Sequence, residues 1–346
     1  TLAQSVGGGQ GIDTLLGIEN IIGSSYADTF RGDNTKSNTF NGGIASLLTP
    51  NVEATNDEND TVIYDELVNS NDKIVVDLSN TITSNVQVTI SGVAQGSDRL
   101  INIENVTGTA GNDTFTGNND NNTFVGGAGN DVFYATSQND GADVIDGDAV
   151  TNSGSDTVDY SALNNSANKI VVDLSTLVDN YSNVTVTAVN EPATATDNDD
   201  KIRNIENVIG TAGADTITGN GENNILDGKS GNDEIKGGAG DDVLKGGEEY
   251  TITLGTGPYS FNIGSTPITG ANIDALVTYF NSNASDKGIV TKVNATTLKI
   301  TSSDYVITPS TGVTITETSF DTVKYDDATA GVTVDLGDNS SQQNIG

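Results

Sequence analysis

Regularly spaced aspartates are the residues of this chain with the most readily assigned chemistry. In two stretches an Asp or Asn recurs every nine residues, and an apolar residue follows two positions later. The acidic members are Asp113 and Asp131 in one stretch, and Asp215, Asp233 and Asp242 in the other. Carboxylates repeated at a fixed spacing suit a hard divalent cation such as Ca²⁺, which takes six to eight oxygen ligands. The pattern therefore predicts calcium binding.

The composition removes most other chemistry. His, Cys, Met and Trp are absent from the 346 residues, which excludes nucleophile–imidazole pairs, thiolates, disulfides and the usual zinc sites. The formal net charge of −34 at pH 7 disfavours nucleic acid and anionic membranes as partners. No apolar run approaches the ~18 residues of a membrane span. Gly228-Lys229-Ser230 ends like a phosphate-binding loop, but Asn223 stands where that motif needs Gly. We therefore predict a chain that is not an enzyme.

The nine-residue period also predicts how the chain folds. Frames open with Gly at 108, 117 and 126, and again at 210, 219, 228 and 237. One apolar residue per nine suits a coil with two short strands and two turns, or 18 residues per lap, in which the eighth residue points inward. Asp113 would then stack over Asp131, and two charges one strand spacing apart repel by roughly 1 kcal/mol in water. A calcium ion between laps would reverse that repulsion, whereas the uncharged Asn122 and Asn224 should bind weakly.

The best single copies, 126–134 and 237–245, resemble the G-G-x-G-x-D-x-U-x nonapeptide of RTX (repeats-in-toxin, hemolysin-type) calcium-binding repeat proteins. The resemblance implies an all-β fold, a parallel β-roll or β-helix solenoid with calcium-binding turns and Ca²⁺ as its cofactor. The predicted metal-binding residues are Asp28, Asp113, Asp131, Asp143, Asp156, Asp215, Asp233, Asp242 and Asp321, with the turn glycines Gly127, Gly129, Gly231, Gly238 and Gly240.

A longer repeat sets the predicted domain organisation. The phrase Ile-Glu-Asn occurs at 18–20, 103–105 and 205–207, each time ahead of a Gly-rich stretch. A segment of different character interrupts the last unit, and its alternating strands and the helical spacing of Ile273, Leu276, Val277 and Phe280 predict a small inserted α+β module. We expect the array to run past both ends of the sequence. The predicted domains are an incomplete repeat unit 1–107, a unit 108–209 with its best nonapeptides at 108–134, a β-roll 210–247, the inserted module 248–320, and a truncated continuation 321–346.

Composition, repeats and resemblance together predict a non-catalytic structural segment. We expect it to belong to a secreted bacterial cell-surface protein, an S-layer lattice or adhesin, that folds on binding extracellular calcium. The resemblance implies type I secretion, and the expected partners besides calcium are further copies of the chain or cell-surface polysaccharide. Two alternatives stay open. One is the C-terminal repeat region of a secreted enzyme or toxin whose active domain lies outside the segment. The other is a glycan- or surface-binding adhesin module that uses 248–320 for recognition.

Overall fold

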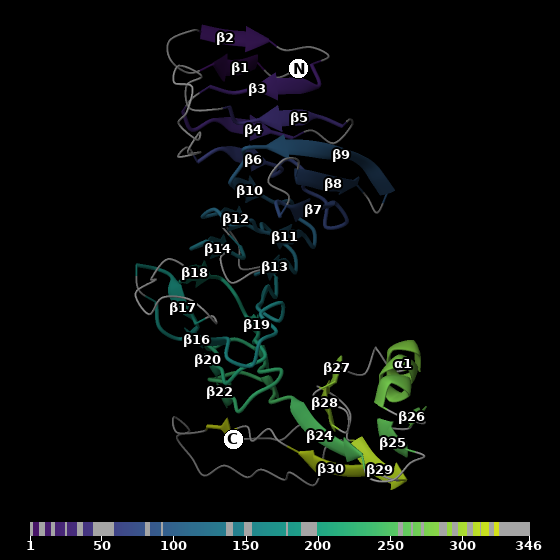
Figure 1. The fold of residues 1–346 in the computed structure, drawn as a ribbon. Coiled ribbons are helices and arrows are strands. Elements are labelled where there is room, and N and C mark those ends of the chain that lie inside the picture. Colours follow the sequence, from purple (N-terminus) through teal and green to yellow (C-terminus); the bar gives the residue numbers. More distant parts are fainter. Residues whose placement is uncertain are drawn as a thin grey trace, which may run out of the picture. The chain divides into compact units, whose positions relative to one another are not determined.

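The fold consists almost entirely of short strands, drawn in Figure 1. It comes from a computed structural model that divides into two compact units, Thr1–Asp156 and Thr157–Gly346. The residues it describes are 3–6, 11–14, 18–24, 26–32, 37–43, 59–79, 84–90, 93–135, 141–148, 154–177, 179–187, 199–254, 259–263, 266–270, 273–283, 289–292, 297–302, 307–311, 313–317 and 322–324.

One sheet of the first unit is a stack of short parallel strands, each paired with the strand of the neighbouring lap (Figure 1). The central residues Phe30, Val62, Val106, Phe124 and Ile145 face one another in register and are all buried. The strand order is β4 (Thr29–Arg31), β6 (Thr61–Ile63), β10 (Asn105–Thr107), β12 (Thr123–Val125) and β14 (Val144–Asp146).

The other large sheet of the first unit mixes parallel and antiparallel pairs. The consecutive strands β7 (Lys73–Asp77), β8 (Ser84–Ile90) and β9 (Val93–Ile101) pair antiparallel, while β7 pairs parallel with β11 (Thr114–Thr116) and β9 pairs parallel with β5 (Thr39–Asn41). A separate antiparallel pair is formed by β1 (Ala3–Val6) and β2 (Gly11–Thr14). The order of the sheet is β3 (Asn20–Ile22), β5 (Thr39–Asn41), β9 (Val93–Ile101), β8 (Ser84–Ile90), β7 (Lys73–Asp77), β11 (Thr114–Thr116) and β13 (Val132–Tyr134).

The second unit repeats this arrangement. Its first sheet has the order β18 (Asp200–Arg203), β17 (Ser182–Thr187), β16 (Lys169–Asp173), β20 (Thr216–Thr218), β22 (Glu234–Lys236) and β31 (Thr322–Val323). Its second sheet is wholly parallel, with the order β15 (Thr157–Asp159), β19 (Asn207–Ile209), β21 (Ile225–Asp227) and β23 (Val243–Lys245). The predicted parallel β-roll is therefore confirmed.

The core of the roll is the ladder of eighth-position residues. Phe115 pairs in register with Phe133, 18 residues later, and their rings stack at 5.0 Å with 9° between the planes. Phe124, on the opposite sheet, lies 5.3 Å from Phe115 between ring centroids. Aliphatic residues take the same place in the second unit, where Ile217 faces Ile235. A buried side chain of this size contributes about 1.5–3 kcal/mol, so one apolar residue per nine can hold successive laps together.

The stretches that link the nonapeptide runs do not follow the nine-residue period. They form antiparallel strands, called excursions below, which the sequence pattern did not predict. In the second unit β16 pairs antiparallel with β17, which pairs antiparallel with β18. The strand residues alternate between buried and exposed in β7 and β16, so one face still covers the core. The excursion thus widens the sheet without interrupting the roll, because β16 also pairs parallel with β20.

The segment after β23 forms the expected small α+β module. One of its sheets has the order β27 (Ile289–Lys292), β28 (Thr297–Ser302), β24 (Glu248–Leu254) and β30 (Val313–Glu317), and the other β26 (Thr266–Gly270), β25 (Tyr259–Ile263) and β29 (Ile307–Thr311). The helix α1 (Ile273–Asn283) buries Leu276 completely. Among the residues that the structure describes, no helix is long and apolar enough to cross a membrane. The boundaries predicted at 107/108, 209/210, 247/248 and 320/321 remain predictions.

Truncating one ring of the phenylalanine ladder tests the core. Phe133→Ala removes a buried ring from the stack with Phe115, and we expect a loss of about 3–5 kcal/mol in the free energy of unfolding. Chemical denaturation in excess calcium measures it. The matched control is Tyr134→Ala in the same strand, because Tyr134 is 42% exposed and its loss should cost far less. Equal losses for the two variants would contradict the assigned core.

Candidate metal centres

In each nine-residue repeat, counted from its opening glycine, the Asp at the sixth position lies in a turn at the edge of the roll, directly before a strand. Asp113 precedes β11 and Asp131 precedes β13 in the first unit, while Asp215 precedes β20 and Asp233 precedes β22 in the second. The eighth residue of each repeat must point into the core, which turns the sixth side chain into the interior of the turn. All four carboxyl groups are buried, and Asp131 has no exposed surface at all.

Each buried carboxylate accepts a backbone N–H from the preceding lap. Oδ1 of Asp113 accepts the N–H of Ile74 at 2.7 Å, and Oδ1 of Asp131 accepts the N–H of Asp113 at 2.7 Å. The N–H of Asp131 donates in turn to Oδ1 of Asp156 at 2.7 Å. These bonds form a ladder along one edge of the first unit. The ladder brings the three predicted residues Asp113, Asp131 and Asp156 together.

The same ladder occurs in the second unit and on the opposite edge of the roll. Oδ1 of Asp215 accepts the N–H of Ile170 at 2.7 Å, and Oδ1 of Asp233 accepts the N–H of Asp215 at 2.8 Å. On the opposite edges, the N–H donors are Asp28, Asn122 and Asn224, and the acceptors are Asp60, Asp143 and Asp242 respectively, at 2.6–3.0 Å.

The predicted residues therefore lie in equivalent turn positions. Asp143 and Asp156 are buried, whereas Asp28 and Asp242 are partly exposed. Asp321 lies outside the described residues. Their role as metal ligands remains a proposal.

Burial makes these carboxyl groups hard to ionise. Desolvation raises the pKa of Asp131 to about 8, and the neighbouring acids Asp113, Asp156 and Asp148 push it in the same direction. Desolvation also raises the pKa of Asp113 to about 7 and that of Asp215 to about 6, although hydrogen bonds from Thr109 and Thr211 oppose the shift. Without a cation, the turns hold protons or repelling charges.

One carboxylate oxygen of Asp131 lacks a hydrogen-bond partner. Its Oδ2 is buried and has no hydrogen-bond partner, although a buried carboxylate oxygen normally has one. The same oxygen and the carbonyl oxygen of Gly147 both face Gly126, at the place that a Cβ on residue 126 would fill. A carboxylate and a backbone carbonyl on one side of a glycine are the oxygen ligands that Ca²⁺ takes. The residues present therefore fit calcium.

The predicted turn glycines are required by the backbone of the neighbouring lap. Gly127 and Gly129 have φ of +107° and +116°, and Gly231, Gly238 and Gly240 have φ of +128°, +99° and +116°. A Cβ at each would overlap a carbonyl group of the preceding lap, such as that of Thr109 at Gly127. The turns thus stack carbonyl oxygens beside the carboxylates.

Backbone carbonyls must supply a large part of any metal shell. Within the described ranges, no three acidic side chains gather closely enough to hold a metal ion by themselves. The ladder instead presents its carboxylates lap by lap, with turn carbonyls between them. This favours calcium, which accepts carbonyl oxygens, over cations that need a compact carboxylate cage.

Two buried glutamates were not predicted as part of the ladder. Oε2 of Glu104 accepts the N–H of Asp60 at 2.9 Å, so this glutamate takes the place of a sixth-position Asp. Glu206 is buried in the equivalent Ile-Glu-Asn phrase of the second unit. The exact recurrence of that phrase was the available signal. Asp146, Asp148 and Asp227 are also buried and were not singled out.

Two further features have structural explanations. The hydroxyl groups of Tyr64 and Tyr160 donate to Oδ2 of Asp98 and Asp200 at 2.8 and 2.7 Å, which locks the linking strands to the roll.

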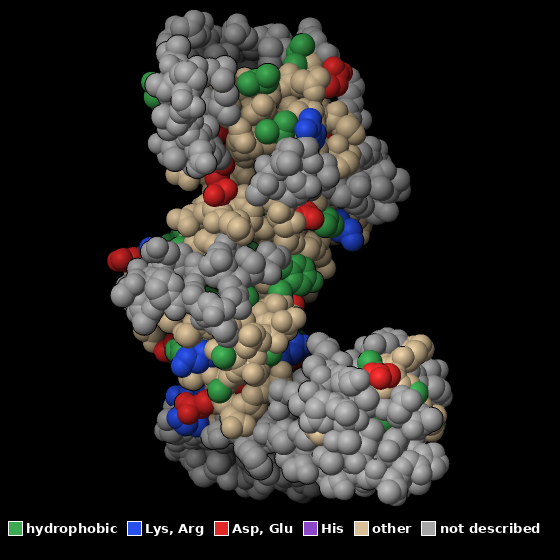
Figure 2. All heavy atoms as spheres, viewed as in Figure 1, with side chains coloured by type: hydrophobic (Ala, Val, Ile, Leu, Met, Phe, Trp, Pro, Cys, Tyr) green, Lys and Arg blue, Asp and Glu red, His purple; other side chains and the backbone are tan. Residues whose placement is uncertain are grey.

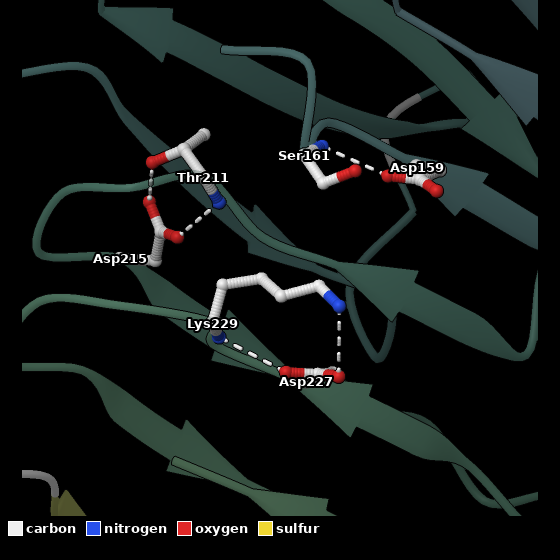
Figure 3. Close-up of polar contacts among 6 residues, drawn as sticks. All are labelled: Asp159, Ser161, Thr211, Asp215, Asp227 and Lys229. Carbon is white, nitrogen blue, oxygen red and sulfur yellow. Dashed lines mark hydrogen bonds and ion pairs between the residues drawn. The ribbon is translucent and has the colours of Figure 1, made fainter. Parts of the chain in front are cut away.

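Lys229 lies in a nonapeptide turn, and its N–H and ammonium group both contact the Asp227 carboxylate (Figure 3). The Gly228-Lys229-Ser230 triplet is therefore a roll turn. Lys and Arg side chains are scattered singly or in small groups on the face in Figure 2.

Neutralising the most buried ligand candidate tests the site. Asp131→Asn keeps the acceptor for the Asp113 N–H but removes the charge, so we expect the calcium concentration at the folding midpoint to rise at least about threefold. Circular dichroism during a calcium titration measures this midpoint. Asp120→Asn is the matched control, because Asp120 is exposed in the adjacent turn. A midpoint shifted equally by both substitutions would argue against Asp131 as a ligand.

The raised pKa values predict a pH dependence for the calcium-free fold. The folded state binds more protons than the unfolded chain between the ordinary pKa of 3.8 and the raised pKa of about 8 for Asp131. Stability in EDTA should therefore be greatest at the acidic end of this window and fall as pH rises through it. Circular dichroism in EDTA at pH 5 and pH 8 measures the difference as the fraction of β-structure. A fraction that rises with pH would be inconsistent with buried, protonated carboxyl groups.

Comparisons with known proteins agree with the geometry. Residues 107–142, 204–235 and 218–249 match the RTX calcium-binding nonapeptide repeat family, which the comparison finds in four copies. No curated protein matches the chain significantly. The matched stretches contain Asp113, Asp131, Asp215, Asp233 and Asp242, and repeats of this family bind calcium ions. The chain therefore carries RTX calcium-binding nonapeptide repeats at 107–142 and 204–249.

Proposed function

We propose that the chain is a calcium-folded structural segment of a secreted bacterial cell-surface protein, an S-layer lattice or an adhesin. The observation that carries the proposal is the row of buried carboxylates in the turns of both units, with the orphaned Oδ2 of Asp131 among them. When these carboxylates are ionised, a counter-ion offsets their repulsion and desolvation, so the row couples the fold to calcium. The calcium ligands we propose are the sixth-position Asp side chains and the turn carbonyls.

Calcium would act as a switch between two environments. The net charge of −34 and the small apolar content keep the calcium-free chain expanded by self-repulsion. Ions that bind only the folded state stabilise it by mass action, which at 100 times the dissociation constant amounts to about 2.7 kcal/mol per site. A chain exported by type I secretion would thus remain unfolded where calcium is scarce and fold outside the cell.

A structural role suits the described residues better than a catalytic one. Their buried acids are used by backbone N–H groups, by the hydroxyl groups of Tyr64 and Tyr160, and by neighbouring laps. The helix and two small sheets after Lys245 form a module with its own buried residues, Ile268, Leu276 and Ile300. In a surface array, such a module would be placed to contact further copies of the chain or cell-surface polysaccharide.

A calcium titration tests this function. We expect the 346-residue chain to pass cooperatively from coil to β-structure between EDTA and ~10 mM calcium, followed by ordered assembly seen by light scattering. Magnesium at equal concentration is the control and should not replace calcium, because it requires a smaller octahedral shell. Folding without assembly would argue against a lattice and favour an adhesin or the repeat region of a secreted enzyme or toxin. Full β-structure of equal stability in EDTA would refute the calcium mechanism.

A further inference from the structure

The turns of the roll adopt two backbone conformations that differ at the second position of the nonapeptide. Gly127 and Gly238 occupy this position with φ of +107° and +99°, and Lys229 with φ of +70°. We call these the open turns. The turns with Ser24, Thr109, Asn118, Thr211 or Asn220 at the second position have no positive φ there, and we call them the closed turns.

In a closed turn, the second-position residue makes two local hydrogen bonds, one of them to the sixth-position side chain. The N–H of Thr109 donates to Oδ2 of Asp113 at 2.6 Å, and Oγ1 of Thr109 accepts the N–H of Gly111 at 3.0 Å. Thr211 makes the same bonds, to Oδ2 of Asp215 at 2.6 Å and from Gly213 at 3.1 Å. Figure 3 shows the Thr211 N–H and hydroxyl group both aimed at the Asp215 carboxylate.

The other closed turns repeat this pair of bonds. The second-position N–H of Ser24, Asn118 and Asn220 donates to the side chain four residues later at 2.5–3.0 Å. Their own side-chain oxygens accept the N–H two residues later at 2.8–3.2 Å. Every closed turn in the described residues thus has a Ser, Thr or Asn at its second position, and Gly cannot supply that oxygen.

In an open turn the second-position N–H points away from the carboxylate. Gly127 donates its N–H to the carbonyl oxygen of Gly147 at 3.1 Å, and Lys229 donates to Oδ1 of Asp227 at 3.0 Å. The Oδ2 of Asp131 is then left buried with no donor. The fourth residue of this turn, Gly129, also has a positive φ.

The residue at the sixth position follows the same division. Two of the closed turns hold an uncharged Asn122 or Asn224, which accepts the second-position N–H as well as an Asp does. The side-chain amides of these residues donate to the carbonyl oxygens of Glu104 and Glu206 at 3.0 and 2.7 Å, in the place between laps that a cation would bridge. Among the uninterrupted nonapeptides whose second and sixth positions are both described, the three open turns all keep an acid, Asp131, Asp233 or Asp242.

We propose that the second-position residue selects which turns bind calcium, so that open turns bind the ion and closed turns are sealed by their own hydrogen bonds. Thr109 and Thr211 then keep the first turn of each nonapeptide run in the closed conformation, which does not bind calcium. The proposal rests on calcium binding by the roll. Among the turns classified above, it assigns calcium binding to those with Asp131, Asp233 and Asp242 and removes Asp28, Asp113 and Asp215 from the predicted ligands.

Converting closed turns into open ones tests the selection. The double variant Thr109→Gly, Thr211→Gly removes both sealing oxygens and permits positive φ, so it should bind about two more calcium ions per chain than the native protein. Equilibrium dialysis followed by elemental analysis measures the count, with folding verified by circular dichroism. The matched control, Thr109→Val with Thr211→Val, loses the hydroxyl groups but keeps a β-branched residue, and its count should be unchanged.

The reverse substitution provides a second readout. Gly127→Thr should cost about one calcium ion per chain, whereas Ala128→Thr, one residue away, should leave the count unchanged. If Gly127→Thr does not fold, the Thr→Gly variant decides alone. Calcium binding by the native chain with an unaltered count in the folded Thr→Gly variant would overturn the selection and leave the proposed function intact. A native chain that binds no calcium would refute both.

Discussion

The structure depends on burying carboxylates in turns that are only nine residues apart. The eighth residue of each repeat must enter the core, and this forces the sixth side chain into the turn interior, where Asp131 has no exposed surface. Desolvation of that kind raises the pKa of Asp131 to about 8, so the turn must neutralise the group with a proton, a hydrogen-bond donor or a cation. The ladder of N–H donors, the stacked carbonyls and the fit to calcium all follow from this requirement.

Because the apolar core is weak, the need to neutralise the buried carboxylates can control whether the chain folds. With 34% hydrophobic residues and 40 glycines, the chain has little apolar surface to bury, and its core consists of two facing files, such as Phe115 stacked on Phe133 with Phe124 opposite. Each lap therefore contributes little more than its conformational entropy costs. Ion binding that exists only in the folded state can decide the balance, which makes calcium a control on folding instead of an addition to a stable fold.

The period of the sequence predicted the repeating part of the fold and could not predict the rest. Phe124, Phe133 and Ile217 were assigned to the core because their spacing sets their direction, and all three are buried. The antiparallel excursions around β8 and β17 pair strands that are neighbours in the sequence, but these strands do not follow the nine-residue period, so the period does not encode their pairing. Glu104 was missed although it stands nine residues before Asp113, because the residue is Glu instead of Asp and its frame opens with Arg99 instead of Gly.

The division into closed and open turns was also present in the sequence, in the choice of Thr or Gly after the first glycine. Its meaning depends on the direction of one peptide N–H, which only coordinates reveal: toward Asp113 from Thr109, and toward Gly147 from Gly127. In a closed turn the carboxylate accepts a hydrogen bond from the turn's own backbone, which makes the turn locally rigid. In an open turn the carboxylate remains available to a ligand. The two runs at 108 and 210 both begin with a closed turn, so within the folded roll the first carboxylate of each run is satisfied by its own backbone, and the later open turns depend on calcium.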